Sequence, residues 1–312
     1  MKLYQRKPND PAPAGQADPY IIKAEDGRYY VYATGPGGPS LFSSDSLLEG
    51  WTYEGECLDM TGQKSCWAPC VVYIDGKYYM YYSSLDADAK DEHQQTLRVA
   101  VSDSPRGPFR MMKKLLPPFS IDPHVVVNSS GIYHFYCQNV LDTERVGTHI
   151  FCDRMSDPFT MEGNAVCVVK PTLDEEIYMR NRFKEGEDWH TVEGAFYFHV
   201  GQTHFLMFSG ANYTNPTYFI GYCVAHGPEN ADLRTLAWKK YPDENTYAPL
   251  LCNTELTEGM GHNSVIFDEG ECYIVYHGRD RGAVGLSGDV RCARIDRMSI
   301  DGEVLRVHSL GV

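Results

Sequence analysis

Residues 27–34 read GRYYVYAT, and this pattern of aromatic and β-branched residues recurs four more times along the chain. Such segments favour β-strands. The other copies are residues 76–84 (GKYYMYYSS), 131–137 (GIYHFYC), 202–210 (QTHFLMFSG) and 271–278 (ECYIVYHG). A second apolar run of strand length stands just before each copy, and in most cases a turn with glycine separates the two. Each pair of runs therefore predicts a β-hairpin.

The five copies are spaced like the units of a repeat protein. Repeats of about 40 to 50 residues with four short strands each, lengthened by loops, are typical of β-propellers. Helical periodicity is weak, and no linker divides the chain. The sequence therefore predicts an all-β fold, a five-bladed β-propeller that forms a single domain over residues 1–312, with a two-sheet sandwich as the alternative. The equivalent starting residues, which lie 49, 55, 71 and 69 residues apart, are Tyr29, Tyr78, Tyr133, His204 and Tyr273.

The composition of the 312 residues indicates a folded, acidic protein. It is 43% hydrophobic and 22% charged, with a formal net charge of -14, which disfavours nucleic acid and anionic membranes as partners. The first residues lack the apolar core of a secretory signal and no later run has membrane-spanning length, so we expect a soluble cytoplasmic protein. The 10 cysteines include no CxxC pair, which favours reduced thiols. A zinc site at Cys66 and Cys70 would lack a second ligand pair.

Each hairpin opens with a residue at the same place in the repeat. The offset from this residue to the residue just before the second strand's starting aromatic position is 10, 9, 10, 10 and 10 residues, so the five hairpins share one register. Because the first strand of a propeller blade lies innermost, we expect these opening residues to surround one mouth of the central channel. They are Asp18, Ala68, Asp122, Glu193 and His262.

Three of these positions hold carboxylic acids, which are Asp18, Asp122 and Glu193. Like charges near one axis repel, so at least one pKa must rise. One ionised and one protonated carboxyl are what hydrolysis of a glycosidic bond requires, and a third can keep the acid protonated. Two other interpretations remain: the acids with His262 form a site for a hard cation, or each acid caps a local turn. A non-catalytic carbohydrate-binding propeller or a scaffold also stays open.

Six short motifs follow one another along nearly the whole chain: Gln16–Pro19 (QADP), Trp67–Pro69 (WAP), Ile121–Pro123 (IDP), Val192–Ala195 (VEGA), Gly261–Ser264 (GHNS) and Tyr276–Arg279 (YHGR). In this order they resemble glycoside hydrolase family 43, five-bladed propellers that act on arabinose- and xylose-containing glycans. The resemblance implies that Asp18 is the general base, Asp122 the modulator of the acid's pKa, and Glu193 the general acid of an inverting reaction. Ala195 departs from the family, in which proline is common at this place.

The same resemblance implies further site residues. His262 would coordinate a calcium ion, directly or through water, while Trp67 and Arg279 would bind the substrate. For Trp67, packing within a blade is an equal alternative. Asn9-Asp10-Pro11 resembles the nucleophile motif of retaining invertase-type propellers, but Asp10 has no counterpart in the other hairpins. Mannoside phosphorylases would need a basic phosphate-binding cluster, which we do not identify in the sequence.

These features predict an inverting exo-glycoside hydrolase whose partner is an oligosaccharide substrate. We expect it to release a pentose from short arabinose- or xylose-containing oligosaccharides, with α-L-arabinofuranosides favoured and β-xylosides next. Exo action is favoured because, without a secretion signal, short imported substrates suit the protein better than polymers. Residues 142–190 are the longest insertion and lead into Glu193, so we expect them to form a rim or lid. The sequence does not predict the oligomeric state.

Overall fold

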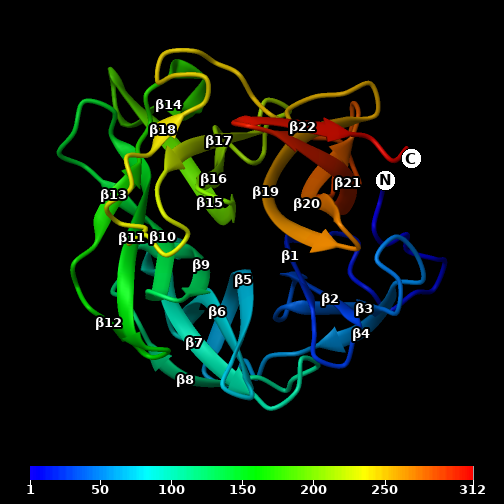
Figure 1. Ribbon diagram of the computed structural model, residues 1–312. Coiled ribbons are helices and arrows are strands. Elements are labelled where there is room, and N and C mark those ends of the chain that lie inside the picture. The colour runs from blue at the N-terminus through cyan, green and yellow to red at the C-terminus, as the bar shows by residue number, and fades with distance from the viewer. Residues whose placement is uncertain (312) are drawn as a thin grey trace.

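The computed structural model describes residues 1–311, in which strands and their connections surround a central axis (Figure 1). Two short 3₁₀ helices, η1 (Glu92–Gln94) and η2 (Asp174–Glu176), interrupt the strands. Five antiparallel blades are arranged around the axis, with β1, β5, β9, β15 and β19 innermost (Figure 1). The predicted five-bladed β-propeller is therefore confirmed. No helix among residues 1–311 is long and apolar enough to cross a membrane.

The blades are numbered I to V in chain order. Blade I contains β1 (Ala17–Lys23), β2 (Tyr29–Thr34), β3 (Ser40–Ser44) and β4 (Thr52–Glu56). Blade II contains β5 (Gln63–Ile74), β6 (Lys77–Asp86), β7 (Thr96–Ser102) and β8 (Arg110–Lys114). Blade III contains β9 (Ser120–Asn128), β10 (Gly131–Val140), β11 (Gly147–Asp157), β12 (Thr160–Met161) and β13 (Val166–Val169).

Blades IV and V complete the ring. Blade IV contains β15 (Glu187–Val200), β16 (Thr203–Gly210), β17 (Phe219–His226) and β18 (Lys239–Lys240), and β14 (Ile177–Lys184) pairs with the start of β15. Blade V contains β19 (Thr257–Asp268), β20 (Glu271–Asp280), β21 (Cys292–Asp301) and β22 (Val304–His308). Each predicted hairpin corresponds to the first two strands of one blade.

The hydrophobic core lies between neighbouring blades. Side chains on a strand point alternately to the two faces of its sheet, and in β2 both faces are covered. Tyr30 and Tyr32 pack in a cluster that includes Met80 of blade II. Val31, between them in sequence, packs in a different cluster with Val275 of blade V. The near-continuous apolar runs that predicted strands are therefore strands buried on both faces.

A β-bulge interrupts the pairing of every first strand with the second strand of its blade. In blade I the pairing steps from Ala17 opposite Thr34 to Tyr20 opposite Tyr32, so two residues face one. The bulged residue has a positive φ, a backbone region that favours glycine. These residues are Asp18 (51°), Ala68 (46°), Asp122 (54°), Gly194 (63°) and His262 (44°).

The bulges correct the predicted register in blade IV. Glu193 was expected to be equivalent to Asp18, but Gly194 occupies that position, and Glu193 stands one residue earlier, opposite Ser209. A Cβ on Gly194 would lie 3.1 Å from His262 Cγ, so a side chain there would crowd the histidine. The sequence signal for the correct register is Ala195, which stands where three other hairpins have proline.

Hydrogen bonds between consecutive blades fix the bulges. In four of the five contacts between blades, the bulged residue's backbone N–H donates to a side chain of the preceding blade. The distances are 2.9 Å from Ala68 N to Thr34 Oγ1, 3.2 Å from Gly194 N to Asp122 Oδ2, 2.7 Å from His262 N to Ser209 Oγ, and 3.1 Å from Asp18 N to His277 Nδ1.

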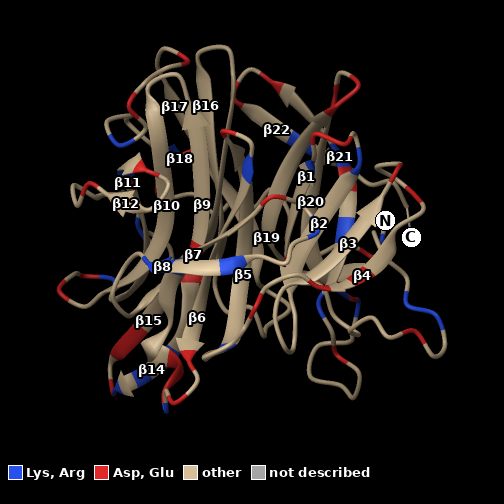
Figure 2. Ribbon diagram, turned by 90° about the horizontal axis from the view of Figure 1, so that it is seen from below, with Lys and Arg blue, Asp and Glu red and all other residues tan. Residues whose placement is uncertain are grey.

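Residues 142–190 form a rim only in their last part, which corrects the expectation that the whole segment is an insertion. Their first part supplies the outer strands β11, β12 and β13 of blade III. The hairpin of β14 with the start of β15 projects from the lower edge of the molecule in Figure 2. Its base is anchored by Glu176, which is fully buried and pairs with Lys240 of blade IV at 2.5 Å.

Candidate active site

A pocket of about 250 Å³ lies where the bulges meet. This volume is near the lower end for small-molecule sites and suits a single sugar ring. The structure thereby brings together five predicted site residues, one from each blade: Asp18, Trp67, Asp122, Glu193 and His262. The lining residues are Asp18, Thr34, Trp67, Glu92, Ile121, Asp122, Glu193, Tyr213, Tyr218, His262 and Arg291.

Asp18 is held as an ionised carboxylate. Its Oδ2 accepts a hydrogen bond of 2.7 Å from the Thr34 hydroxyl, and Oδ1 lies 3.1 Å from Arg291 Nη1. His277 Nδ1 lies 3.2 Å from the same Oδ1. Burial alone would raise the pKa of this carboxyl, but the charge of Arg291 and the neighbouring histidines outweigh burial and hold the pKa well below its usual range. Asp18 can therefore accept a proton.

Glu193 is held as an acid near neutral pH. Burial raises the pKa of Glu193 to about 7, and the negative charge of Asp18 acts in the same direction. The Tyr218 hydroxyl donates a hydrogen bond of 2.8 Å to Oε1, which partly opposes the rise. The two catalytic candidates thus have separated pKa values, as an acid and a base at one site require.

Asp122 shares its electrostatic environment with Glu193. Its Oδ2 accepts the hydrogen bond from Gly194 N and lies 3.8 Å from His262 Nδ1. Burial, and then the charges of Glu193 and Asp18, raise the pKa of Asp122 well above its usual range. Asp122 and Glu193 therefore titrate as a coupled pair that keeps a proton near neutral pH. The proposed role of Asp122 as modulator depends on this coupling.

His262 faces carboxylates. Its Nδ1 lies 3.5 Å from Asp18 Oδ1, and burial lowers the pKa of the imidazole, so the ring is neutral near pH 7. Among residues 1–311, no group of three His, Cys, Asp or Glu side chains is arranged to hold a metal ion. Calcium takes six to eight oxygen ligands. The side chains present therefore do not fit a calcium ion held directly by protein, and the predicted ion would depend on water ligands.

Arg279, which was expected in the sugar pocket, lies outside its lining. Its Nε donates to Asp289 Oδ1 at 2.6 Å and its Nη1 to the Tyr213 carbonyl at 2.7 Å, so the buried guanidinium holds two loops together. Arg291 takes the place in the pocket instead. Its guanidinium lies 4.8 Å from the centre of the Tyr213 ring and pairs with Asp18.

The functional candidates missed by sequence reasoning share a location. Glu92, Tyr213, Tyr218 and Arg291 all lie on connections between the second and third strands of a blade, namely β6–β7, β16–β17 and β20–β21. These connections differ in length and sequence, so the repeat gives no signal there. His277 did have a signal, because it stands within the YHGR motif.

Asp10, the alternative nucleophile, lies away from this pocket. Its carboxylate accepts hydrogen bonds from Tyr4, from Ala12 N at 3.0 Å and from Lys7 N at 3.3 Å, which is a turn-stabilising role. It lines a separate hollow of about 620 Å³ formed largely by the N-terminal segment. The retaining interpretation therefore has no support in the geometry.

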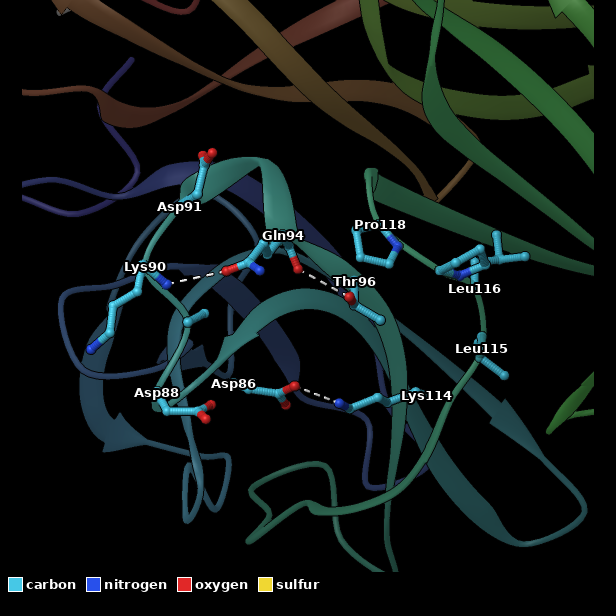
Figure 3. Close-up of a pocket in the computed structure, with 12 residues that line it drawn as sticks. Asp86, Asp88, Lys90, Asp91, Gln94, Thr96, Lys114, Leu115, Leu116 and Pro118 are labelled. Atoms are coloured by element: carbon cyan, nitrogen blue, oxygen red, sulfur yellow. Dashed lines mark hydrogen bonds and ion pairs between the residues drawn. The ribbon is translucent and has the colours of Figure 1, made fainter.

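A further hollow of about 600 Å³ lies on blade II (Figure 3). Three aspartates line it, of which Asp86 pairs with Lys114 at 2.6 Å and with Arg98 at 2.9 Å, and Asp91 contacts His93 at 2.7 Å. Neither Asp18 nor Glu193 lines it. The hollow thus lacks the separated acid and base of the central pocket, although its wall continues into the η1 segment that carries Glu92.

An ionised and a protonated carboxyl facing one sugar-sized pocket are the pair that glycoside hydrolases use. Comparison with known proteins agrees, since the profile of Glycosyl hydrolases family 43 matches residues 10–304. The chain belongs to this family. A thermostable family-43 glycoside hydrolase of known crystal structure superposes with a TM-score of 0.78 at 30% identity, covering 95% of this chain and 93% of that one.

Two relatives with named activities are similar to the chain in sequence. The chain is 28% identical over 301 residues to an extracellular exo-α-(1→5)-L-arabinofuranosidase of Streptomyces avermitilis, a match that covers 90% of this chain and 57% of the relative. It is 28% identical over 178 residues to xylosidase/arabinosidase 43A of Humicola insolens, which covers 46% of this chain and 53% of the relative. The chain thus spans little more than half the length of these relatives.

Proposed function

We propose that this protein is an inverting exo-acting glycosidase that releases α-L-arabinofuranose from short arabinose-containing oligosaccharides. The observation that carries the proposal is that one small pocket is lined both by Asp18, whose pKa Arg291 holds low, and by Glu193, whose pKa burial raises to about 7. A pocket of about 250 Å³ suits one terminal sugar better than the middle of a polymer. The name of the Streptomyces avermitilis relative supports arabinofuranose as the sugar and exo as the mode of action.

The residues divide the reaction between them. Asp18 accepts a proton from a water molecule while the water oxygen bonds to the anomeric carbon. The bond from that carbon to the glycosidic oxygen breaks, and Glu193 gives its proton to the departing oxygen. The products are the free sugar and a shortened saccharide, and the proton gained by Asp18 replaces the one lost by Glu193 through solvent. Because water enters opposite the leaving group, the anomeric configuration inverts.

Arg291 has a supporting electrostatic role in this scheme. It keeps Asp18 ionised, and it stacks on Tyr213, which fixes the guanidinium beside the carboxylate. Thr34 donates a hydrogen bond to the carboxylate, and His277 Nδ1 accepts one from the backbone N–H of Asp18, which fixes the position of the base. The trio therefore prepares the base before substrate binds, which is the type of preorganisation that lowers a reaction barrier.

A panel of nitrophenyl glycosides tests the proposal. Pure protein should cleave the α-L-arabinofuranoside faster than the β-D-xyloside and the galactosides. Proton NMR of the first product should show β-arabinofuranose, and arabinotriose should give arabinose and arabinobiose first. An α product would contradict inversion, and early release of longer fragments from arabinan would contradict exo action.

β-Xylosidase activity is the second candidate. It is favoured by the similarity to the xylosidase/arabinosidase of Humicola insolens. Faster turnover of the xyloside in the same panel would establish it in place of the arabinofuranosidase activity. Both outcomes use the same acid and base, because the two pentosides differ in ring size and hydroxyl orientation and not in the bond that breaks.

A further inference from the structure

A second cavity of about 130 Å³ adjoins the active-site pocket on the side of the catalytic acid. Trp67, Glu92, Ile121, Glu193 and Tyr213 line both spaces. Asp18 lines only the first. Since the acid protonates the departing oxygen and the base holds water, a cavity that contains the acid without the base lies where the leaving group stands.

Arg182 of the β14–β15 hairpin lines this second cavity. Its guanidinium carbon lies 4.8 Å from the centre of the Tyr178 ring and 4.9 Å from those of Phe183 and Trp189. No carboxylate among residues 1–311 pairs with it, unlike Arg180 two residues earlier, which pairs with Asp188. Ring contacts occupy the faces of a guanidinium and leave the N–H groups at its edge available.

Asn139 and Glu92 supply further polar groups to the same cavity. Asn139 Oδ1 accepts a hydrogen bond of 3.1 Å from Thr148, while its NH₂ group has no partner within the described part of the chain. Glu92 presents an exposed carboxylate as an acceptor. Donors together with an acceptor match the hydroxyls of a neutral sugar. The Glu92 carboxylate disfavours a leaving group that itself carries a carboxylate.

We infer that the second cavity binds a neutral sugar as the leaving group and that Arg182 determines this specificity by donating hydrogen bonds to its hydroxyls. The inference rests on the proposed function, because it assigns the leaving-group side from the roles of Asp18 and Glu193. The inference also explains the role of the β14–β15 hairpin. Its aromatic rings hold Arg182 in position before the oligosaccharide binds, through contacts with Tyr178, Phe183 and Trp189.

The test compares a sugar leaving group with an aryl one. Arg182→Met removes the N–H donors and keeps an unbranched side chain against the rings. The nitrophenyl leaving group has no hydroxyl other than the glycosidic oxygen that Glu193 protonates, so it offers Arg182 no sugar hydroxyl to bind. We expect kcat/KM for α-1,5-arabinobiose to fall about ten-fold or more, as loss of hydrogen bonds from a charged group implies, while kcat/KM for nitrophenyl α-L-arabinofuranoside changes less than about two-fold.

Lys184→Met is the matched control. Lys184 lies on the same hairpin, but it lines neither cavity and makes one exposed contact of 3.9 Å with Glu187. It should leave both substrates unaffected. Asn139→Ala is the second variant, from a different strand, and it should reproduce the selective loss if Arg182→Met fails to fold. Equal losses on both substrates, or no loss on arabinobiose, in folded variants would overturn the inference.

Failure of the inference and failure of the proposed function give different results. Wild-type protein that cleaves nitrophenyl xyloside in place of the arabinofuranoside contradicts the proposed sugar. The same variants are then compared on xylobiose and nitrophenyl xyloside, and the ratio of the two losses still decides the role of Arg182.

Discussion

The hydroxyl of Tyr218 donates a hydrogen bond of 2.8 Å to Oε1 of Glu193. Tyr218 lies on the β16–β17 connection of blade IV, and Glu193 lies on β15 of the same blade, next to the bulge. The Tyr218 ring lies nearly parallel to His277, with an interplanar angle of 7°. A Cβ on Gly261 would lie 1.8 Å from Tyr218 Cε1, so the ring can occupy this place only beside glycine. Glycine at position 261 thus secures the hydrogen bond to the acid.

Tyr218→Phe should move the alkaline limb of the kcat/KM profile to higher pH. The hydrogen bond stabilises the ionised form of Glu193 and lowers its pKa, so without it the acid stays protonated to higher pH. The limb in question reports the essential acid of the free enzyme. Tyr247→Phe, outside the pocket, is the control. An unchanged or lowered limb would mean that Tyr218 serves another purpose.

Arg291→Met should move the acidic limb of the same profile to higher pH. The arginine holds the pKa of Asp18 low, so without it the base takes up a proton at higher pH and activity is lost earlier on acidification. Arg281→Met is the matched control, because Arg281 lies on the same connection and contacts Glu258 at 3.9 Å. An acidic limb that does not move would exclude Arg291 as the residue that keeps the base ionised.

Glu193→Ala and Asp18→Ala should differ in their dependence on the leaving group. Removal of a general acid costs about a hundred- to ten-thousand-fold in rate. Glu193→Ala should show such a loss on arabino-oligosaccharides and far less on a dinitrophenyl arabinofuranoside, whose leaving group needs little protonation. Asp18→Ala should lose rate on both. Identical patterns in the two variants would refute the assignment of acid and base.

Asp122→Asn should move the alkaline limb to lower pH. The substitution keeps the shape of the side chain and removes a carboxyl whose titration is coupled to that of Glu193. With less repulsion, Glu193 ionises at lower pH. The pH profile of a folded variant checks this direction. A limb that stays in place or rises would indicate that Asp122 positions water or sugar instead.

Chelation tests the calcium prediction in its water-mediated form. EDTA should lower the thermal midpoint or the activity, and added calcium should restore it. Magnesium added at the same concentration is the control for ionic strength. If EDTA changes neither quantity, His262 acts through its contact with Asp18 alone.

The fold could be predicted from sequence because its strands are local and repeated. Alternating residues such as Tyr30 and Val31 face different neighbouring blades, so the aromatic runs appear in every unit. The register near Glu193 could not be read from spacing alone, since a bulge shifts the chain by one residue and glycine, not the acid, takes the positive φ.

The site was predictable only where it lies on the repeat. Asp18, Asp122 and His262 stand on bulges, and the repeat brings them together. Arg291 comes from a long connection after the second strand, where no neighbouring blade offers an equivalent residue. Arg279 stands in the YHGR motif, whereas Arg291 stands in no motif. The guanidinium of Arg279 nevertheless donates its hydrogen bonds to Asp289 and to the Tyr213 carbonyl. Sequence order alone does not reveal such tertiary pairing.

The connections between the second and third strands of a blade can vary separately from the inner strands that carry the acid and the base. The acid and the base lie on inner strands that hydrogen bonds join from blade to blade. In contrast, three other pocket residues lie on the connections, namely Glu92, Tyr213 and Arg291. A relative can therefore differ in the β6–β7 connection, which carries Glu92, and bind a different sugar, while the contacts of Arg291 with the base and of Tyr218 with the acid stay in place. For the engineer, the β6–β7 connection is the segment to replace, and the bulges, Tyr218 and Arg291 are to be left unchanged.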